Sequence, residues 1–309
     1  MTASVHLRAA TRASALAQWQ TDAVAEALVE AAARSGVALT VEKVLVETSA
    51  DQRLDIPIHA MGGKGVFVKE VQAAVLDGRA DLAVHSGKDM PAITPDGLVL
   101  ASVPPRADAR DLLIGCTLDG LPHGATVATG SIRRRAQLAH LRPDLRFAEL
   151  RGNIATRLEK AAAFDAIVMA AAAVDRLDID LSDRDIELLD PAVMLPQVAQ
   201  GAMAVECRSA DPDLLQLLAL IEDPVSRLAV DAERAFLAEL GGDCDLPAGA
   251  YATLHGNILE FEALLAAPDG STVLRERRRV PAHDAPEVGR SVARQLLDHR
   301  GGARLLEGR

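Results

Sequence analysis

The chain has 309 residues and a net charge of −11, and 49% of its residues are hydrophobic while 2% are aromatic. This length exceeds what one hydrophobic core usually organises, so we expect a globular protein of two or three domains. The acidic charge and the scarcity of aromatic rings argue against a nucleic-acid-binding protein. The longest apolar run near the middle of the chain has nine residues, Ala166 to Val174, far fewer than the roughly 20 that span a bilayer.

The N-terminal third alternates short apolar runs with amphipathic stretches, which predicts a βαβα series. Ser14 stands where an N-cap residue is expected, and Gly36 and Gly78 follow the helical stretches where a left-handed C-cap residue belongs. The predicted strands and helices are, in order, Val5–Ala9, Ser14–Arg34, Leu39–Glu47, Val66–Leu76 and Asp81–His85.

A second series of the same kind begins near Thr126, after a crossing segment, Ala101–Asp111, that carries Pro104 and Pro105. It consists of strands at 126–130, 146–150 and 166–171 and helices at 132–141 and 154–163. From Asp223 the pattern changes to a long helix at 223–240, a Gly-rich turn, strands at 251–256 and 258–267 and a final helix, which is typical of a small α+β domain.

The predicted fold class is therefore α/β with three domains. Domain 1 comprises 1–104 together with about 200–221, domain 2 comprises 105–199, and domain 3 comprises 222–309. The N-terminus lacks a charged stretch followed by an apolar one, which predicts a cytoplasmic protein. The three widely spaced cysteines indicate reduced thiols, and no paired Cys or His spacing indicates a metal site.

Four strand-to-helix junctions combine a hydroxyl or glycine with a cation. Unpaired backbone N–H groups and the helix dipole bind anions at such junctions, and guanidinium groups add a bidentate grip on carboxylates. Helix capping with a solvated charge is the alternative at any one junction, but four of them favour anion binding. The junctions contain Thr11, Arg12 and Ser14; Gly62, Gly63, Lys64 and Gly65; Ser86, Lys88 and Asp89; and Thr129, Ser131, Arg133 and Arg134.

Two arginine groups lead to different expectations. Arg133 and Arg134 lie in the first turn of a predicted helix, where positive charge opposes the helix dipole unless an anion lies between them. Arg151 and Arg157 follow around a helix start at Asn153. By contrast, the run Arg275–Arg279 is expected to be a solvated strand face.

One carboxylate and one thiol are candidates for chemistry. Asp89 follows an apolar strand, at the edge where α/β active sites gather, although an Asp there is more often an N-cap than a catalyst. Cys244 lies in a turn with Gly241, Gly242 and Pro247, which favours a presented thiol. Cys116 and Cys207 follow apolar runs and are expected to pack as small hydrophobes.

Seven segments in chain order resemble the successive motifs of porphobilinogen deaminases, over roughly Arg8 to Tyr251. They are ATRAS, GGKGVFVKE, AVHSGKDMP, TGSIRRR, LRGNIATRL, LPQVAQGAMAVECR and ELGGDC. The resemblance implies two domains similar to the lobes of type II periplasmic binding proteins, with an active cleft between them, and a third domain carrying a cysteine. It also implies a monomeric transferase that joins four porphobilinogen molecules head to tail into hydroxymethylbilane and releases four ammonia.

The resemblance further implies a dipyrromethane cofactor bound through a thioether to Cys244, and a catalytic Asp89 that stabilises the cationic azafulvene formed as ammonia leaves. The implied cofactor-binding residues are Ser86, Lys88, Thr129, Ser131, Arg133, Arg134, Arg151 and Arg157, and the implied substrate-binding residues are Arg12, Ser14, Lys64, Arg176 and Gln200. The chain departs from the family's pattern at Ser49, Ala50, Ala60, Gly87 and Asp243.

Two alternatives from other classes share the two-lobed architecture. A solute-binding protein for a dicarboxylate would use the same anion sites but would need export, and it has no use for the Cys244 turn. A ligand-sensing transcription regulator would need a helix-turn-helix before the first strand and a less acidic chain. A colour reaction with acidic aldehyde reagent separates all three classes, since only a protein bearing dipyrromethane reddens.

Overall fold

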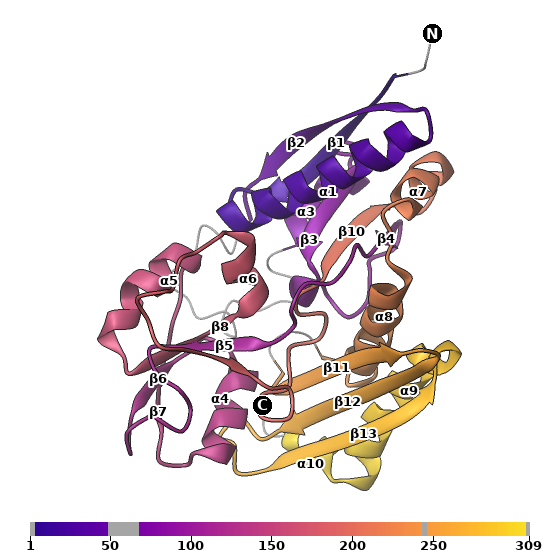
Figure 1. Ribbon diagram of the computed structural model, residues 1–309. Coiled ribbons are helices and arrows are strands. Elements are labelled where there is room, and N and C mark those ends of the chain that lie inside the picture. Colours follow the sequence, from indigo (N-terminus) through magenta and orange to yellow (C-terminus); the bar gives the residue numbers. More distant parts are fainter. Residues whose placement is uncertain (1–3, 49–67, 243–245, 307–309) are drawn as a thin grey trace. The chain divides into compact units, whose positions relative to one another are not determined.

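A computed structural model of the chain describes residues 4–48, 68–242 and 246–306. The described residues divide into two compact units, each with a five-stranded sheet (Figure 1). One unit contains 4–48, 68–107 and 202–227, and the other contains 108–201, 228–242 and 246–306. A separate three-stranded sheet belongs to the second unit.

The sheet of the first unit has the strand order β2-β1-β3-β10-β4, with β10 antiparallel to both of its neighbours. Helices α1 and α7 pack on one face and α3 packs on the other, because successive side chains of β1 point to opposite faces. Its elements are β1 Ser4–Arg12, α1 Ala15–Arg34, β2 Ala38–Val46, α3 Lys69–Leu76, β3 Leu82–Ser86, the 3₁₀ turn η2 Gly87–Asp89, β4 Leu98–Ser102, β10 Met203–Arg208 and α7 Pro212–Ala219.

The sheet of the second unit repeats this arrangement in the order β7-β6-β8-β5-β9, with β5 antiparallel to β8 and β9. Helix α4 packs on one face, and α5 and α6 pack on the other. Its elements are β5 Asp111–Ile114, β6 Thr126–Ala128, α4 Ile132–Leu141, β7 Arg146–Ala148, α5 Ile154–Lys160, the 3₁₀ turn η3 Ala161–Ala163, β8 Ala166–Ala170, α6 Ala171–Arg176 and β9 Ile186–Leu189.

The three-stranded antiparallel sheet β11-β12-β13 packs against α4 through Leu264 and Ala266, which contact Ala136 and Leu195. Phe261 of this sheet meets Phe236 of α8 edge to face, with ring centroids 6.1 Å apart. The elements are α8 Pro224–Glu239, β11 Ala248–His255, β12 Ile258–Ala266, β13 Val273–Pro281, the 3₁₀ turn η4 Ala282–Asp284, α9 Ala285–Arg294, the π-helical turn η5 Gln295–His299 and α10 Gly302–Leu306.

The local signals in the sequence are confirmed. Ser14 caps α1 by accepting a hydrogen bond from the Ala17 N–H, and Gly36 and Gly78 adopt φ of +76° and +73° after α1 and α3. The predicted helix at 132–141 has the bounds of α4. The α/β fold class with two sheet-containing lobes and a small C-terminal sheet is confirmed as well. None of the helices in the described part of the chain combines the length and apolar character that a membrane crossing requires.

Several predicted element bounds were wrong. β1 continues three residues beyond the predicted end at Ala9, because Arg8–Arg12 remain paired with β2, so that Arg12 closes the strand. The helix predicted at 154–163 ends at Lys160 and tightens into a 3₁₀ turn. β11 begins at Ala248 rather than at Tyr251, since its pairing with β12 extends to Leu265.

Candidate functional site

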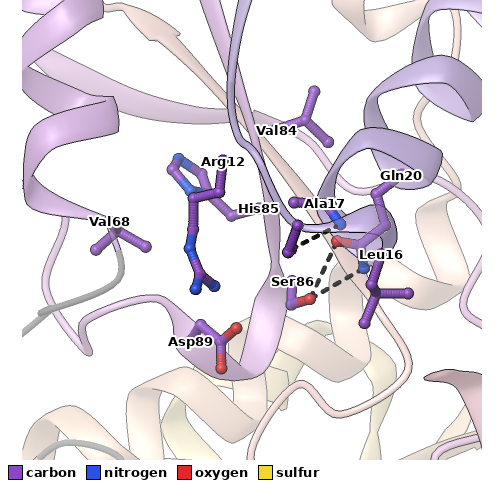
Figure 2. Close-up of a pocket in the computed structure, with 10 residues that line it drawn as sticks. Arg12, Leu16, Ala17, Gln20, Val68, Val84, His85, Ser86 and Asp89 are labelled. Carbon is purple, nitrogen blue, oxygen red and sulfur yellow. Dashed lines mark hydrogen bonds between the residues drawn. The ribbon is translucent and has the colours of Figure 1, made fainter. Parts of the chain in front are cut away.

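The carboxyl ends of β1 and β3 enclose a small pocket of about 50 Å³ in the first unit. Parallel strands bring their carboxyl ends to one edge of the sheet, which is where ligands of open α/β sheets bind. Figure 2 shows this pocket. Its lining combines charged, polar and apolar side chains: Arg12, Ser14, Leu16, Ala17, Gln20, Val68, Val84, His85, Ser86 and Asp89.

Asp89 lies in the 3₁₀ turn that directly follows β3, so its half-buried carboxylate is held at the edge of the sheet where the pocket lies. The turn is anchored at Gly87, whose N–H donates to the Ala202 carbonyl at 2.9 Å. The guanidinium of Arg12 extends toward the Asp89 side chain in Figure 2. A fixed carboxylate here can stabilise a cation that forms during reaction.

Two hydroxyl groups of the pocket form hydrogen bonds within the protein. The Ser14 hydroxyl caps α1, and the Ser86 hydroxyl exchanges hydrogen bonds with the Gln20 amide at 3.0 and 3.1 Å. Ser86 therefore ties the end of β3 to the first turns of α1. The capping alternative for Ser14 is thus correct, and it is compatible with a further contact to a ligand because the residue also lines the pocket.

A cluster of buried polar side chains that begins at the pocket residue His85 was missed from the sequence. His85 Nε2 lies 3.1 Å from Glu206 Oε2, and the Gln72 amide donates to both Glu206 oxygens at 2.9 and 3.2 Å. His85 and Glu206 lie on the same face of the antiparallel pair β3 and β10, which aligns Ala83 with Glu206. Buried carboxylates need such partners, but residues 121 positions apart give no local sequence signal.

The second unit gathers polar groups at the carboxyl ends of β6 and β7. The Thr129 N–H donates to the Ala148 carbonyl at 2.9 Å, and the Thr129 hydroxyl accepts from the Ser131 N–H at 3.2 Å. Ser131 in turn caps α4. The loop after β7 turns at Gly152, whose φ of +119° excludes most other residues. The Gly152 carbonyl accepts from Arg157 Nε at 2.8 Å.

Arg133 and Arg134 have the anion that their position in the first turn of α4 requires, and it is a protein carboxylate. Asp111 accepts from Arg133 Nη2 at 2.7 Å and from Arg134 Nη2 and Nε at 2.7 and 3.0 Å. Burial alone would raise the pKa of Asp111, but the two guanidinium groups outweigh it and lower that pKa to about 2. Arg133 is 1% exposed. Sequence reasoning missed Asp111 because only the pairing of β5 with β8 brings it to this edge.

Asp111→Asn is expected to lower the free energy of unfolding by about 3–5 kcal/mol, because breaking a buried ion pair leaves charges without compensation. The Asp111 pKa falls from 3.8 to about 2 on folding, so its stabilisation is present above about pH 4 and is lost as the pH falls through about 2. Urea unfolding at pH 7 and at pH 2 measures both effects. Asp183→Asn, at an exposed carboxylate of the same unit, is the control. A wild-type-to-variant difference that stays constant down to pH 2 contradicts this assignment.

The other two residues implied for substrate binding also lie in the second unit. Gln200 Nε2 donates to Asp111 Oδ1 at 2.9 Å and to the Ala109 carbonyl at 2.7 Å. Arg176, at the end of α6, donates to the Gly201 carbonyl at 2.7 Å, and burial lowers its pKa to about 10. Gln200 therefore joins the Asp111 cluster, whereas Arg176 holds the chain just before β10.

The strand arginines and the cysteines differ in part from expectation. Arg275 is not simply solvated, because it bonds Glu262 and the carbonyls of Pro191 and Ala192. Cys207 is fully buried in the core, as expected, and burial raises its pKa to about 11. Cys116 is half-buried and packs against the core of the second unit. The predictions for Cys244, Lys64, Ser49, Ala50, Ala60 and Asp243 fall outside the described residues.

The residues present fit a ligand rich in carboxylates. Arg151 Nη1 is buried and has no hydrogen-bond partner in the part of the chain that the structure describes. Leaving a charged donor in this state is costly, so a ligand anion that accepts from it would remove the penalty. Gly130 lies next to this loop, and a Cβ there would come within 3.0 Å of the Leu150 carbonyl. The loops that contain Thr129 and Arg151 are thus adjacent.

Comparisons with known proteins agree with this chemistry. The family described as "Porphobilinogen deaminase, dipyromethane cofactor binding domain" matches residues 7–216, and "Porphobilinogen deaminase, C-terminal domain" matches residues 227–298. The chain is 47% identical to a porphobilinogen deaminase of Roseiflexus castenholzii, over 96% of this chain and 97% of that protein. It is 44% identical to one of Syntrophotalea carbinolica, over 97% and 95%.

Among solved structures, the chain is similar to an ancestral cationic amino acid solute-binding protein. The TM-score is 0.42 and the identity 15%, with 70% of this chain and 88% of that chain covered. The family matches and the relatives extend over nearly the whole sequence. The chain therefore belongs to the porphobilinogen deaminase family and is an enzyme that polymerises porphobilinogen on a dipyrromethane cofactor.

Proposed function

We propose that this chain joins four porphobilinogen molecules head to tail into hydroxymethylbilane, with Cys244 holding the primer by a thioether and Asp89 assisting each deamination. The observation that carries the assignment of the binding residues is Arg151. It offers a buried guanidinium N–H without a partner among the described residues, in a loop that resembles the family's LRGNIATRL motif.

In the first unit, Asp89 supplies the negative charge. As ammonia leaves, positive charge spreads over the pyrrole ring of the substrate, and a preorganised carboxylate stabilises it without reorganising. The same carboxylate can hold the proton that leaves the ring when the new bond has formed. Arg12, Ser14 and Lys64 bind the carboxylate arms of the substrate, and Ser86 and Lys88 contact the primer.

In the second unit, Arg134, Arg151 and Arg157, together with Thr129 and Ser131, bind carboxylates of the primer. Arg133 supports these residues indirectly, since its side chain is 1% exposed and its guanidinium group is bonded to Asp111. Arg176 and Gln200 act during elongation or substrate entry. When bound, dipyrromethane would supply the free pyrrole carbon that accepts the first substrate unit, and each later unit is joined to the ring added before it.

We further propose that the protein acts as a monomer in the cytoplasm. Size-exclusion chromatography with light scattering tests the monomer, and a stable dimer at micromolar concentration would contradict it.

Arg151→Leu is expected to slow cofactor loading by about 10- to 100-fold, because a hydrogen bond to a charged group contributes about 1.5–3 kcal/mol. The measurement reconstitutes apoprotein with porphobilinogen and follows the added mass with time. Arg146→Leu is the matched control, because Arg146 begins β7 and is exposed at the opposite end of the same strand. Equal loading rates in Arg151→Leu and wild type would refute the carboxylate-binding role.

A further inference from the structure

A buried joint connects the two sheets of the second unit. It consists of Asp111, Arg133, Gln137, Leu195 and Gly249. Arg133 donates through Nη2 to Asp111 at 2.7 Å and through Nη1 to the Leu195 carbonyl at 2.5 Å. The Gln137 amide donates to the same carbonyl at 3.1 Å and accepts from the Leu195 N–H at 2.8 Å. Two side chains of α4 thus form hydrogen bonds with both the N–H and the carbonyl group of Leu195.

Gly249, the second residue of β11, closes the joint from the other sheet. A Cβ at this position would lie 2.6 Å from the Pro196 carbonyl oxygen, 3.1 Å from that of Leu195 and 3.2 Å from Arg133 Cδ. Those two oxygens belong to backbone, which cannot move aside as a flexible side chain can. Since the φ of Gly249 lies outside the left-handed region, the requirement for glycine here is one of space.

The joint is close in sequence to the proposed anchor. Gly249 follows Cys244 by five residues. On either side of the anchor, the described residues Gly242 and Leu246 are in contact, since a Cβ on Gly242 would overlap the Leu246 side chain. The Pro247 carbonyl accepts from the Ala266 N–H of β12 at 2.9 Å. The chain after the anchor is therefore fixed first to β12 and then to the joint.

The joint is equally close to the carboxylate-binding residues. Arg134 follows Arg133 in α4 and shares Asp111 with it. Ser131, the cap of α4, lies two residues before Arg133. A shift of β11 against α4 would move the start of β11, which follows the proposed anchor in the chain, relative to the residues that bind the carboxylates of the primer.

We propose that Arg133 and Gly249 are positioning residues for cofactor loading, which hold the start of β11, five residues after Cys244, at a fixed place relative to the carboxylate-binding residues of the second unit. This inference rests on the proposed function, because it takes Cys244 as the anchor. Loading requires the thiol and the carboxylate contacts to meet one ligand at the same time. A joint that is rigid before binding removes the entropic cost of bringing them together.

Gly249→Ala tests the proposal. We expect it to slow loading of apoprotein by porphobilinogen by about 10- to 100-fold, since a displacement of about 1 Å has effects of this size on reactions between positioned groups. Intact mass against time gives the rate. His255→Ala is the control, because His255 is an exposed residue at the far end of the same strand β11. It should load within twofold of wild type.

Phe261→Leu separates positioning from stability. Phe261 is fully buried in the core of the same sheet and is not part of the joint, so the substitution lowers the unfolding temperature without moving Gly249. We expect normal loading. If Phe261→Leu slows loading as much as Gly249→Ala does at a similar loss of stability, the effect is one of stability and the proposal is overturned.

Arg133→Lys is a second variant that tests the same positioning role if Gly249→Ala does not fold. Lysine keeps the charge beside Asp111 but lacks the planar fork that reaches Asp111 and Leu195 together. Loading of Arg133→Lys that is slower than that of wild type supports the proposal, whereas wild-type loading rates overturn it. Peptide mapping of the wild type distinguishes a failure of the proposed anchor from a failure of the positioning role. An adduct on a residue other than Cys244 refutes the anchor. An adduct on Cys244, together with wild-type loading rates in both variants, refutes only the positioning role of Arg133 and Gly249.

Discussion

Replacing Cys244 with serine is expected to yield a protein that carries no dipyrromethane and does not turn over porphobilinogen. A thioether forms when a thiolate attacks an electrophilic carbon, and a serine hydroxyl without an activating base is a far weaker nucleophile at neutral pH. The measurement is intact mass after reduction. The wild type should retain an added mass of two porphobilinogen-derived units on the Cys244 peptide, since a thioether does not exchange as a disulfide does.

The other two cysteines are internal controls for this experiment. Cys207 is fully buried and burial raises its pKa to about 11, so it offers little thiolate. Cys116 packs against the core beside Leu118. Cys207→Ala and Cys116→Ser should therefore keep both the adduct and turnover. An active Cys244→Ala protein, or an adduct on Cys116 or Cys207, would show that the anchor lies elsewhere.

Asp89→Asn is expected to reduce turnover by about 10³-fold or more while leaving the fold and the loaded cofactor in place. Asparagine has nearly the same shape, so the pocket keeps its lining, but it supplies no negative charge to the cation that forms as ammonia leaves and no carboxylate to move a proton. Because this charge exists only during reaction, the loss should fall on kcat more than on KM. Single-turnover ammonia release from loaded protein is the measurement.

Asp96→Asn serves as the control, because Asp96 is an exposed carboxylate in the loop that precedes β4 of the same unit. Its turnover should equal that of wild type. If loaded Asp89→Asn releases ammonia at a rate near that of wild type, then Asp89 has no catalytic role. The N-cap role that the sequence offered as the alternative does not apply, because Ser86 is the N-cap residue of this turn.

The residues whose structure depends on near neighbours could be predicted from the sequence. Ser14 caps α1, Gly36 and Gly78 adopt left-handed conformations, and α4 has the predicted bounds, since each of these depends on hydrogen bonds or sterics within a few residues. The need of Arg133 and Arg134 for an anion also followed from the helix dipole, but the sequence indicated a ligand carboxylate and not Asp111, which the structure places beside them. The chemistry of the site came from short motifs that keep their order along the chain.

The partners of those residues were decided by the tertiary structure. Asp111 reaches Arg133 and Arg134 because β5 pairs with β8 in an antiparallel direction, and Glu206 reaches His85 because β10 returns between β3 and β4. Gly249 is required because the Leu195 and Pro196 backbone passes close to β11. The sequence determines which charged side chains are present, whereas sheet pairing and packing determine which of them meet in the interior. A buried ion is stable only beside a partner of opposite charge, and only the fold brings such residues together when they lie far apart in the sequence.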